Sequence, residues 1–146
     1  MILSAIPIMT WVLYGLLSAV SAALVTIFAK IGLASVDATF ATAIRSGIMF
    51  IFIMGATVIG GKWAGLATLS SKAWWAIILS GAAGALSWIF YFLAVKYGPA
   101  SRAAALDRLS FFFIVLLSLI FLGETLSIKN WVGAAFILVG VILYVI

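Results

Sequence analysis

Cysteine and histidine are both missing from the 146 residues of this chain. Their absence excludes disulfides, cysteine nucleophiles, haem-attachment motifs and the common zinc sites. The three acidic residues are too few for a carboxylate metal cluster beside the structural roles expected of them. The chain also lacks a nucleophile paired with a base, and it lacks a glycine-rich phosphate loop before a helix. We therefore expect no enzymatic reaction, no bound metal and no cofactor.

Charged side chains are scarce as well, at 8% of the chain, against about 25% in an ordinary soluble domain. The eight basic residues outnumber the three acidic ones and give a formal charge of +5. The basic residues are scattered singly, so no stripe exists that could follow a phosphate backbone. We expect no nucleic-acid partner, because single basic residues are typical of the ends of membrane helices.

Hydrophobic residues make up 68% of the chain, more apolar surface than a protein of this size can hide from water. We therefore expect the lipid bilayer to be its main solvent, and an all-α integral membrane fold of five transmembrane helices in one domain, residues 1–146. The five spans are expected at about 10–30, 38–60, 72–96, 99–122 and 128–146. A cleaved signal peptide is the alternative for the first apolar run, but it would lack a basic leading segment.

Local signals mark where three of these spans begin or end. Gly98 and Pro99 are expected to separate the third span from the fourth, since proline suits the first turn of a new helix. Gly123 and Glu124 are expected to end the fourth span, and Ser127 is a plausible N-cap for the fifth.

The tryptophans test the number of spans independently. With five spans of alternating direction, the tryptophans near span ends all lie on one membrane face, named face A: Trp11, Trp63, Trp74, Trp75 and Trp131. Tyr97 and Tyr144 then mark the opposite face, named face B. Such aromatic belts are typical of membrane interfaces, and four or six spans would scatter these tryptophans between the faces.

The most informative charged residues inside the expected spans are Arg45, Asp107 and Arg108. Arg45 and Asp107 both lie roughly 10–12 Å below face B at a rise of 1.5 Å per residue, so we expect an ion pair between them. Lys30 could join this pair by extending its side chain from the end of the first span. Two interpretations stay open: a pair that only fixes helix register, or a hydrated, mainly basic cavity on a transport pathway.

Trp88 is the one tryptophan near the middle of a span, and it shares a helix face with Tyr91. Small and large residues alternate on this face, which also carries Gly81, Gly84 and Val95. The face is either packed or lipid-facing bulk, or it is the aromatic wall of a substrate cavity, where indole and phenol groups orient a ligand by hydrogen bonds.

Several stretches of the chain follow a known pattern. They are Ala29–Leu33 (AKIGL), Ala43–Arg45 (AIR), Tyr91–Ser101 (YFLAVKYGPAS), Leu106–Ser110 (LDRLS), Phe121–Glu124 (FLGE) and Trp131–Ala134 (WVGA). With them the chain resembles the EamA-like domain of the drug/metabolite transporter superfamily, in its five-span bacterial and archaeal branch. Larger members contain two such repeats in opposite orientations, so the resemblance implies a transporter completed by a second copy or by a partner. The family transports many kinds of metabolite, so the resemblance names no substrate.

The combined interpretation is a permease subunit of the cell inner membrane that moves a small polar or amphipathic metabolite by alternating access. The residues expected at the substrate pathway are Lys30, Arg45, Trp88, Tyr91, Asp107 and Arg108. One alternative is a flippase subunit for a lipid-linked substrate, which would bind an anionic lipid headgroup. Another is a membrane scaffold without transport, in which an Arg45→Ala change would abolish assembly rather than flux.

We expect a homodimer whose two copies insert in opposite orientations. The basic residues near span ends are equally divided, with Lys62, Lys72 and Lys129 on face A and Lys30, Lys96 and Arg102 on face B. Counting the deeper Arg45 and Arg108 gives five against three for face B, which is still a weak bias. Gly133 and Gly140 share one face of the fifth span and are the expected dimer interface, because small residues let helix backbones approach closely. The alternative is that both glycines pack against helices of their own chain. Their spacing also resembles that of the dimerising last helix of small multidrug-resistance proteins.

Overall fold

The computed structural model describes residues 8–146, and this part of the chain is helical and without strands. Its elements are α1 (Ile8–Gly32), α2 (Ala38–Ile59), the 3-10 helix η1 (Lys62–Thr68), α3 (Ser71–Tyr97), α4 (Ala100–Asp107), α5 (Leu109–Leu117), the π-helix η2 (Ser118–Leu122) and α6 (Ile128–Val145). Five segments are long and apolar enough to cross a membrane: Thr10–Gly32, Ala38–Ile59, Ser71–Tyr97, Ala100–Leu122 and Ile128–Val145. The expected all-α, five-span membrane fold is confirmed.

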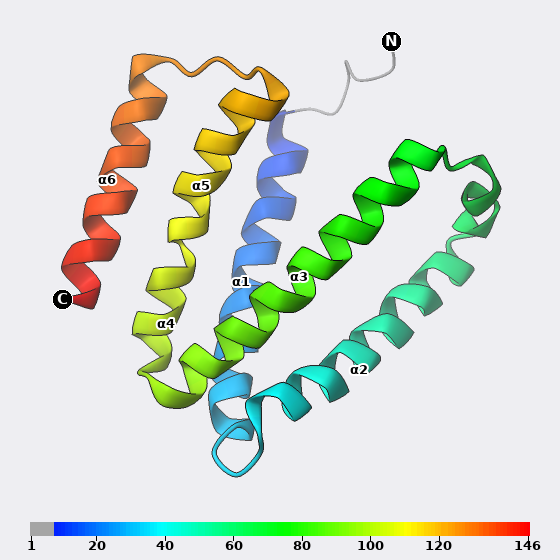
Figure 1. Ribbon diagram of the computed structural model, residues 1–146, viewed down its shortest axis with the longest axis horizontal. Helices are drawn as coiled ribbons and strands as arrows, with labels where there is room; N and C mark the ends of the chain where they lie inside the picture. The colour runs from blue at the N-terminus through cyan, green and yellow to red at the C-terminus, as the bar shows by residue number, and fades with distance from the viewer. Residues whose placement is uncertain (1–7) are drawn as a thin grey trace.

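Helices α1, α2, α3 and α4 meet near face B, and the α2–α3 hairpin separates from the other helices toward face A. Figure 1 shows α1, the α4–α5 segment and α6 side by side, while the hairpin of α2 and α3 leans away from them toward the end that carries η1. Helix α3 contacts α1, α2 and α4, and α6 contacts α4 and α5. The C-terminal half of α3 is therefore the element against which α1, α2 and α4 meet.

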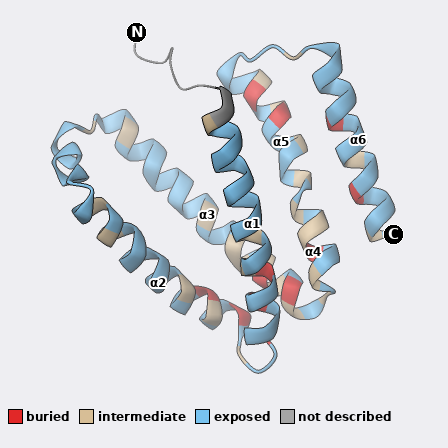
Figure 2. Cartoon of the chain, turned by 180° about the vertical axis from the view of Figure 1, so that it is seen from behind, coloured by how far each residue is buried: buried red, intermediate tan, exposed pale blue. Residues whose placement is uncertain are grey.

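One cluster of buried apolar residues lies close to face B. It consists of Ala29, Leu33, Ala38, Phe92, Val95 and Ala103, which come from α1, α2, α3 and α4. Figure 2 shows buried positions where the α2–α3 hairpin meets the other helices, and further buried positions on α5 and α6. Only 6–11% of each span is buried within this one chain, so most of the helix surface is left for lipid or for another protein.

Two lysines fasten the face B end. Lys30 of α1 donates through Nζ to three carbonyl oxygens at the end of α3, those of Val95 (2.7 Å), Gly98 (2.9 Å) and Lys96 (3.3 Å). In return, Lys96 of α3 donates to the carbonyl oxygen of Val36 in the α1–α2 connection at 2.8 Å. The last carbonyls of a helix have no partner within it and carry partial negative charge, so an ammonium group is a suitable cap.

Helix ends follow the local chemistry of the sequence. Ser127 caps α6 as expected, accepting a hydrogen bond from the Asn130 N–H at 3.4 Å. Gly98 ends α3 and Pro99 directly precedes α4. Gly123 ends the fourth span with φ of 65°, a left-handed conformation that glycine adopts without a steric penalty.

The fourth span is interrupted at Arg108. Its N–H bonds to the Ala105 carbonyl at 3.0 Å and its own carbonyl accepts from the Phe111 N–H at 3.1 Å, so the helix tightens to a three-residue spacing there. No proline or glycine occurs between Ala100 and Leu122 to signal this break. The break lies beside the two charged residues of the span, Asp107 and Arg108.

Candidate functional site

A polar cavity of about 270 Å³, named the central cavity, lies between α1, α3 and the α4–α5 junction. Its lining consists of Ala22, Thr26, Ser87, Trp88, Tyr91, Asp107, Arg108 and Ser110. Four of the six residues expected at the substrate pathway therefore lie around one space: Trp88, Tyr91, Asp107 and Arg108.

The aromatic wall of the central cavity is held by contacts within α3 and to α1. Trp88 meets Tyr91 edge-to-face, with ring centroids 5.7 Å apart and planes at 86°, and meets Phe92 in the same way at 5.8 Å. Edge-to-face pairs of this kind stabilise aromatic clusters and fix their orientation. The Tyr91 hydroxyl also shares a hydrogen bond with Thr26 Oγ1 of α1. This bond ties the wall to the opposite helix.

Thr26 is a lining residue that the sequence analysis missed. Its side chain is buried, and it also donates to the Ala22 carbonyl at 3.0 Å within its own helix. A signal was available, because Thr26 lies one helical turn before Lys30 and one turn after Ala22 on the same face of α1. In an otherwise apolar span, a hydroxyl on the packed face points to a polar partner on another helix.

Arg45 does not form the expected ion pair with Asp107. Within residues 8–146 its guanidinium has no ion-pair partner, and Nη1 is buried without a hydrogen-bond acceptor. The group stacks instead on the Trp88 ring, with Cζ 3.7 Å from the ring centroid, and lies 5.4 Å from the Phe92 centroid. The prediction was wrong because equal depth does not make two helices neighbours: α2 packs along α3, and an aromatic face of α3 takes up the guanidinium as a cation–π contact.

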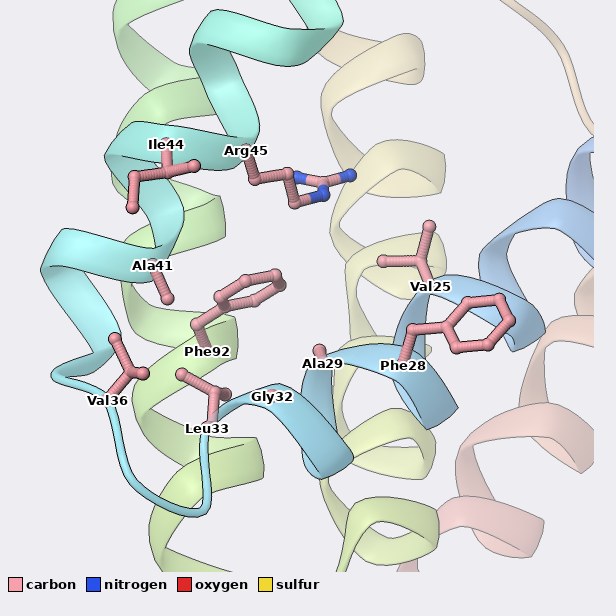
Figure 3. A pocket seen from close by; sticks show the side chains of 10 residues that line it. All are labelled: Val25, Phe28, Ala29, Gly32, Leu33, Val36, Ala41, Ile44, Arg45 and Phe92. Carbon is pink, nitrogen blue, oxygen red and sulfur yellow. The ribbon is translucent and has the colours of Figure 1, made fainter.

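Arg45 borders a second cavity of about 370 Å³, named the Arg45 cavity, between α1, α2 and α3. Figure 3 shows the guanidinium directed into the space between α2 and α1, above Val25 and Phe92. The full lining is Val25, Phe28, Ala29, Gly32, Leu33, Val36, Ala41, Ile44, Arg45 and Phe92. Arg45 is thus the one charged side chain on an otherwise apolar lining.

Lys30 lies apart from both cavities, where its ammonium caps the end of α3. All three of its N–H bonds have a carbonyl acceptor, so the group is hydrogen-bonded without a substrate. Its placement on the substrate pathway stays a prediction, and the contacts that the structure does give it are structural.

Gly133 and Gly140 border two grooves along α6. Gly133 lines a groove of about 480 Å³ against α5, with Ser118 and Glu124, and Gly140 lines another of about 480 Å³ against α4, with Arg108. A Cβ atom added at either glycine would meet no heavy atom within 4 Å. Neither glycine is therefore in tight contact with the described helices of its own chain, and the space beside each is open.

Comparison with known proteins agrees with this architecture. A protein of Sinorhizobium sp. named "Uncharacterized transporter in cobO 3'region" is 40% identical to the chain over 134 residues, which cover 92% of this chain and 95% of that protein. No solved structure matches the chain. The pattern of the EamA-like transporter family matches residues 9–146, nearly the whole chain. The five-span chain with its polar central cavity belongs to the EamA-like transporter family.

Proposed function

We propose that this multi-pass membrane protein is a permease subunit of the inner membrane that moves a small polar or amphipathic metabolite by alternating access. Its family and the printed name of its relative support a transporter. The observation that carries the proposal is the central cavity. Charged groups inside a span cost several kcal/mol unless they are paired or hydrated, and Asp107 and Arg108 border a shared space with four hydroxyl-bearing neighbours.

The shape of the chain supports a rocking movement. The core and the lysine contacts hold α1, α2, α3 and α4 together near face B, while the α2–α3 hairpin separates from the other helices toward face A. A bundle that is fastened at one end can pivot there with little loss of packing. Rocking of this kind around a central site is how many secondary transporters expose that site to each side in turn.

The first experiment identifies the substrate class. The purified protein is screened against metabolite classes by the shift in melting temperature, since a ligand at 100 times its Kd stabilises by about 2.7 kcal/mol. A stabilising compound is then tested for flux in proteoliposomes, with Asp107→Asn and Trp88→Phe as test variants. Trp75→Phe is the matched control, because Trp75 is exposed near face A, outside the central cavity. Loss of flux in the two test variants, with normal assembly and normal flux in the control, supports a permease.

The same experiment separates the alternatives. A scaffold without transport predicts no flux of any stabilising compound, and an Arg45→Ala variant that fails to assemble. A flippase subunit for lipid-linked substrates predicts that anionic lipid headgroups stabilise the protein while soluble metabolites do not.

The proposed permease is a homodimer of antiparallel copies. The small buried fraction of each span and the open grooves at Gly133 and Gly140 support a second copy, and the equal number of basic residues near the span ends at both faces supports insertion in both orientations. A reporter fused to the C-terminus should give signal from both sides of the membrane, and signal from one side alone would refute dual insertion. Because the chain has no native cysteine, Gly133→Cys and Gly140→Cys can be crosslinked directly in bilayers, and a strictly monomeric result would remove the dimer.

A further inference from the structure

Within residues 8–146, the Arg45 guanidinium lacks a counterion. Asp37 accepts hydrogen bonds from the Thr39 and Phe40 N–H groups at the start of α2. Asp107 borders the central cavity, and Glu124 borders the groove between α5 and α6. All three acidic residues of the sequence are thus placed elsewhere.

The contacts of Arg45 occupy one face of the guanidinium and leave its buried Nη1 group without an acceptor among the described residues. Stacking on Trp88 occupies a face of the plane, whereas hydrogen-bond acceptors bind guanidinium at the edge, in the plane. Within residues 8–146 no acceptor is present for Nη1. A buried donor without an acceptor is destabilising, so the arrangement is complete only when a further acceptor approaches.

The Arg45 cavity has the dimensions and lining for a small molecule of one kind. Its volume of about 370 Å³ falls within the roughly 300–1,000 Å³ that is common for small-molecule sites. Aliphatic and aromatic side chains of α1, α2 and α3 surround the space (Figure 3), and the single cation lies at one side of it. An apolar space beside one guanidinium matches a molecule with an apolar body and one anionic group.

We propose that the Arg45 cavity binds an amphipathic organic anion, with its carboxylate or phosphate group on the edge of Arg45 and its apolar body against Val25, Leu33 and Phe92. This proposal rests on the proposed permease function and names the chemical class of one substrate or co-substrate. Trp88 links the site to transport, since its ring stacks on Arg45 and also lines the central cavity. An anion on Arg45 therefore borders the aromatic wall beside Asp107 and Arg108.

The test compares two probes of nearly the same shape, octanoate with an anionic head group and octanamide with a neutral one. Their binding is measured by calorimetry to the full chain in phosphatidylcholine nanodiscs, with the signal of empty nanodiscs subtracted. Wild-type protein should bind octanoate about 10- to 100-fold more tightly than octanamide, as expected for a charge-assisted hydrogen bond. Equal affinity of the two probes for wild-type protein would overturn the proposal without needing any variant.

Variants then assign the preference to Arg45. Arg45→Gln should reduce the octanoate-to-octanamide ratio to about one while leaving octanamide binding intact. Arg102→Gln removes a positive charge at an exposed position outside both cavities and should keep the full ratio. A wild-type ratio in Arg45→Gln would overturn the assignment.

Two further experiments test whether the bound anion is a lipid and whether the permease function holds independently of the anion site. Nanodiscs that contain phosphatidylglycerol should weaken octanoate binding if the headgroup of an anionic lipid occupies Arg45, and should not do so if only a free organic anion enters. Octanoate flux in proteoliposomes tests the permease separately. Charge-selective binding without flux of any compound would contradict the permease function and support the anion site. Flux without charge selectivity at Arg45 would support the permease function and contradict the anion site.

Discussion

Lys30 offers the sharpest test of how the face B end is held together. Its ammonium group donates to the carbonyl oxygens of Val95, Lys96 and Gly98, at 2.7, 3.3 and 2.9 Å. A Lys30→Met change keeps most of the side-chain volume and removes all three donors. We expect the variant to fold with lower stability, because the α3 carbonyls lose their cap and α1 loses its polar attachment to α3.

The expected loss follows from the contacts. A hydrogen bond that involves a charged group contributes about 1.5–3 kcal/mol when it is well shielded. Here three bonds share one ammonium, and water at the membrane face can solvate the freed carbonyls, so we expect about 2 kcal/mol in total. For a chain of this length that corresponds to a drop in melting temperature of roughly 4–8 °C.

The measurement is thermal unfolding of purified protein in one detergent. Lys72→Met is the matched control, since it makes the same replacement near face A, at an exposed lysine in the first turn of α3. Lys30→Arg keeps the charge and should recover part of the loss. Equal melting temperatures for Lys30→Met and Lys72→Met would refute the role of Lys30 as a cap.

Three further predictions concern other contacts. Thr26→Val and Tyr91→Phe should be non-additive in a double-mutant cycle by about 0.5–1.5 kcal/mol, because their hydroxyls share a hydrogen bond; additive losses would contradict that bond. Gly123→Ala should destabilise by about 1–2 kcal/mol because φ is 65° there, whereas Gly47→Ala, in open space within α2, should be neutral or stabilising. The Phe40 N–H, and after it the Thr39 N–H, hold the pKa of the Asp37 carboxyl below its ordinary value of 3.8. Its contribution to stability is therefore complete above that value and is lost as the pH falls through the lowered pKa. When melting temperature is measured against pH, Asp37→Asn should reduce the fall in melting temperature at acid pH. An unchanged fall would exclude Asp37 as its source.

Some of the missing contacts could have been anticipated from the sequence, and others could not. Thr26 lies one turn from Lys30 on a helix with few polar groups, so its partnership with Tyr91 follows from a pattern that was visible. The interruption of the fourth span at Arg108 had no such signal, since no proline or glycine is near it. Lys30 was expected to extend toward charged partners, but its acceptors are backbone carbonyls. Every residue has such a carbonyl, so the sequence does not show which ones a lysine will reach.

What the sequence determined by itself is the fold class and the ends of its helices. Solvent preference is a local property of a run of about 20 residues, so the five spans could be placed without a structure. The helix ends at Gly123 and Ser127 also depend on neighbours in the chain. Tertiary structure alone decided which charged side chains meet. Depth along a helix follows from residue number, but the lateral position and rotation of each helix follow from packing across the bundle, and packing placed Arg45 on Trp88 rather than beside Asp107.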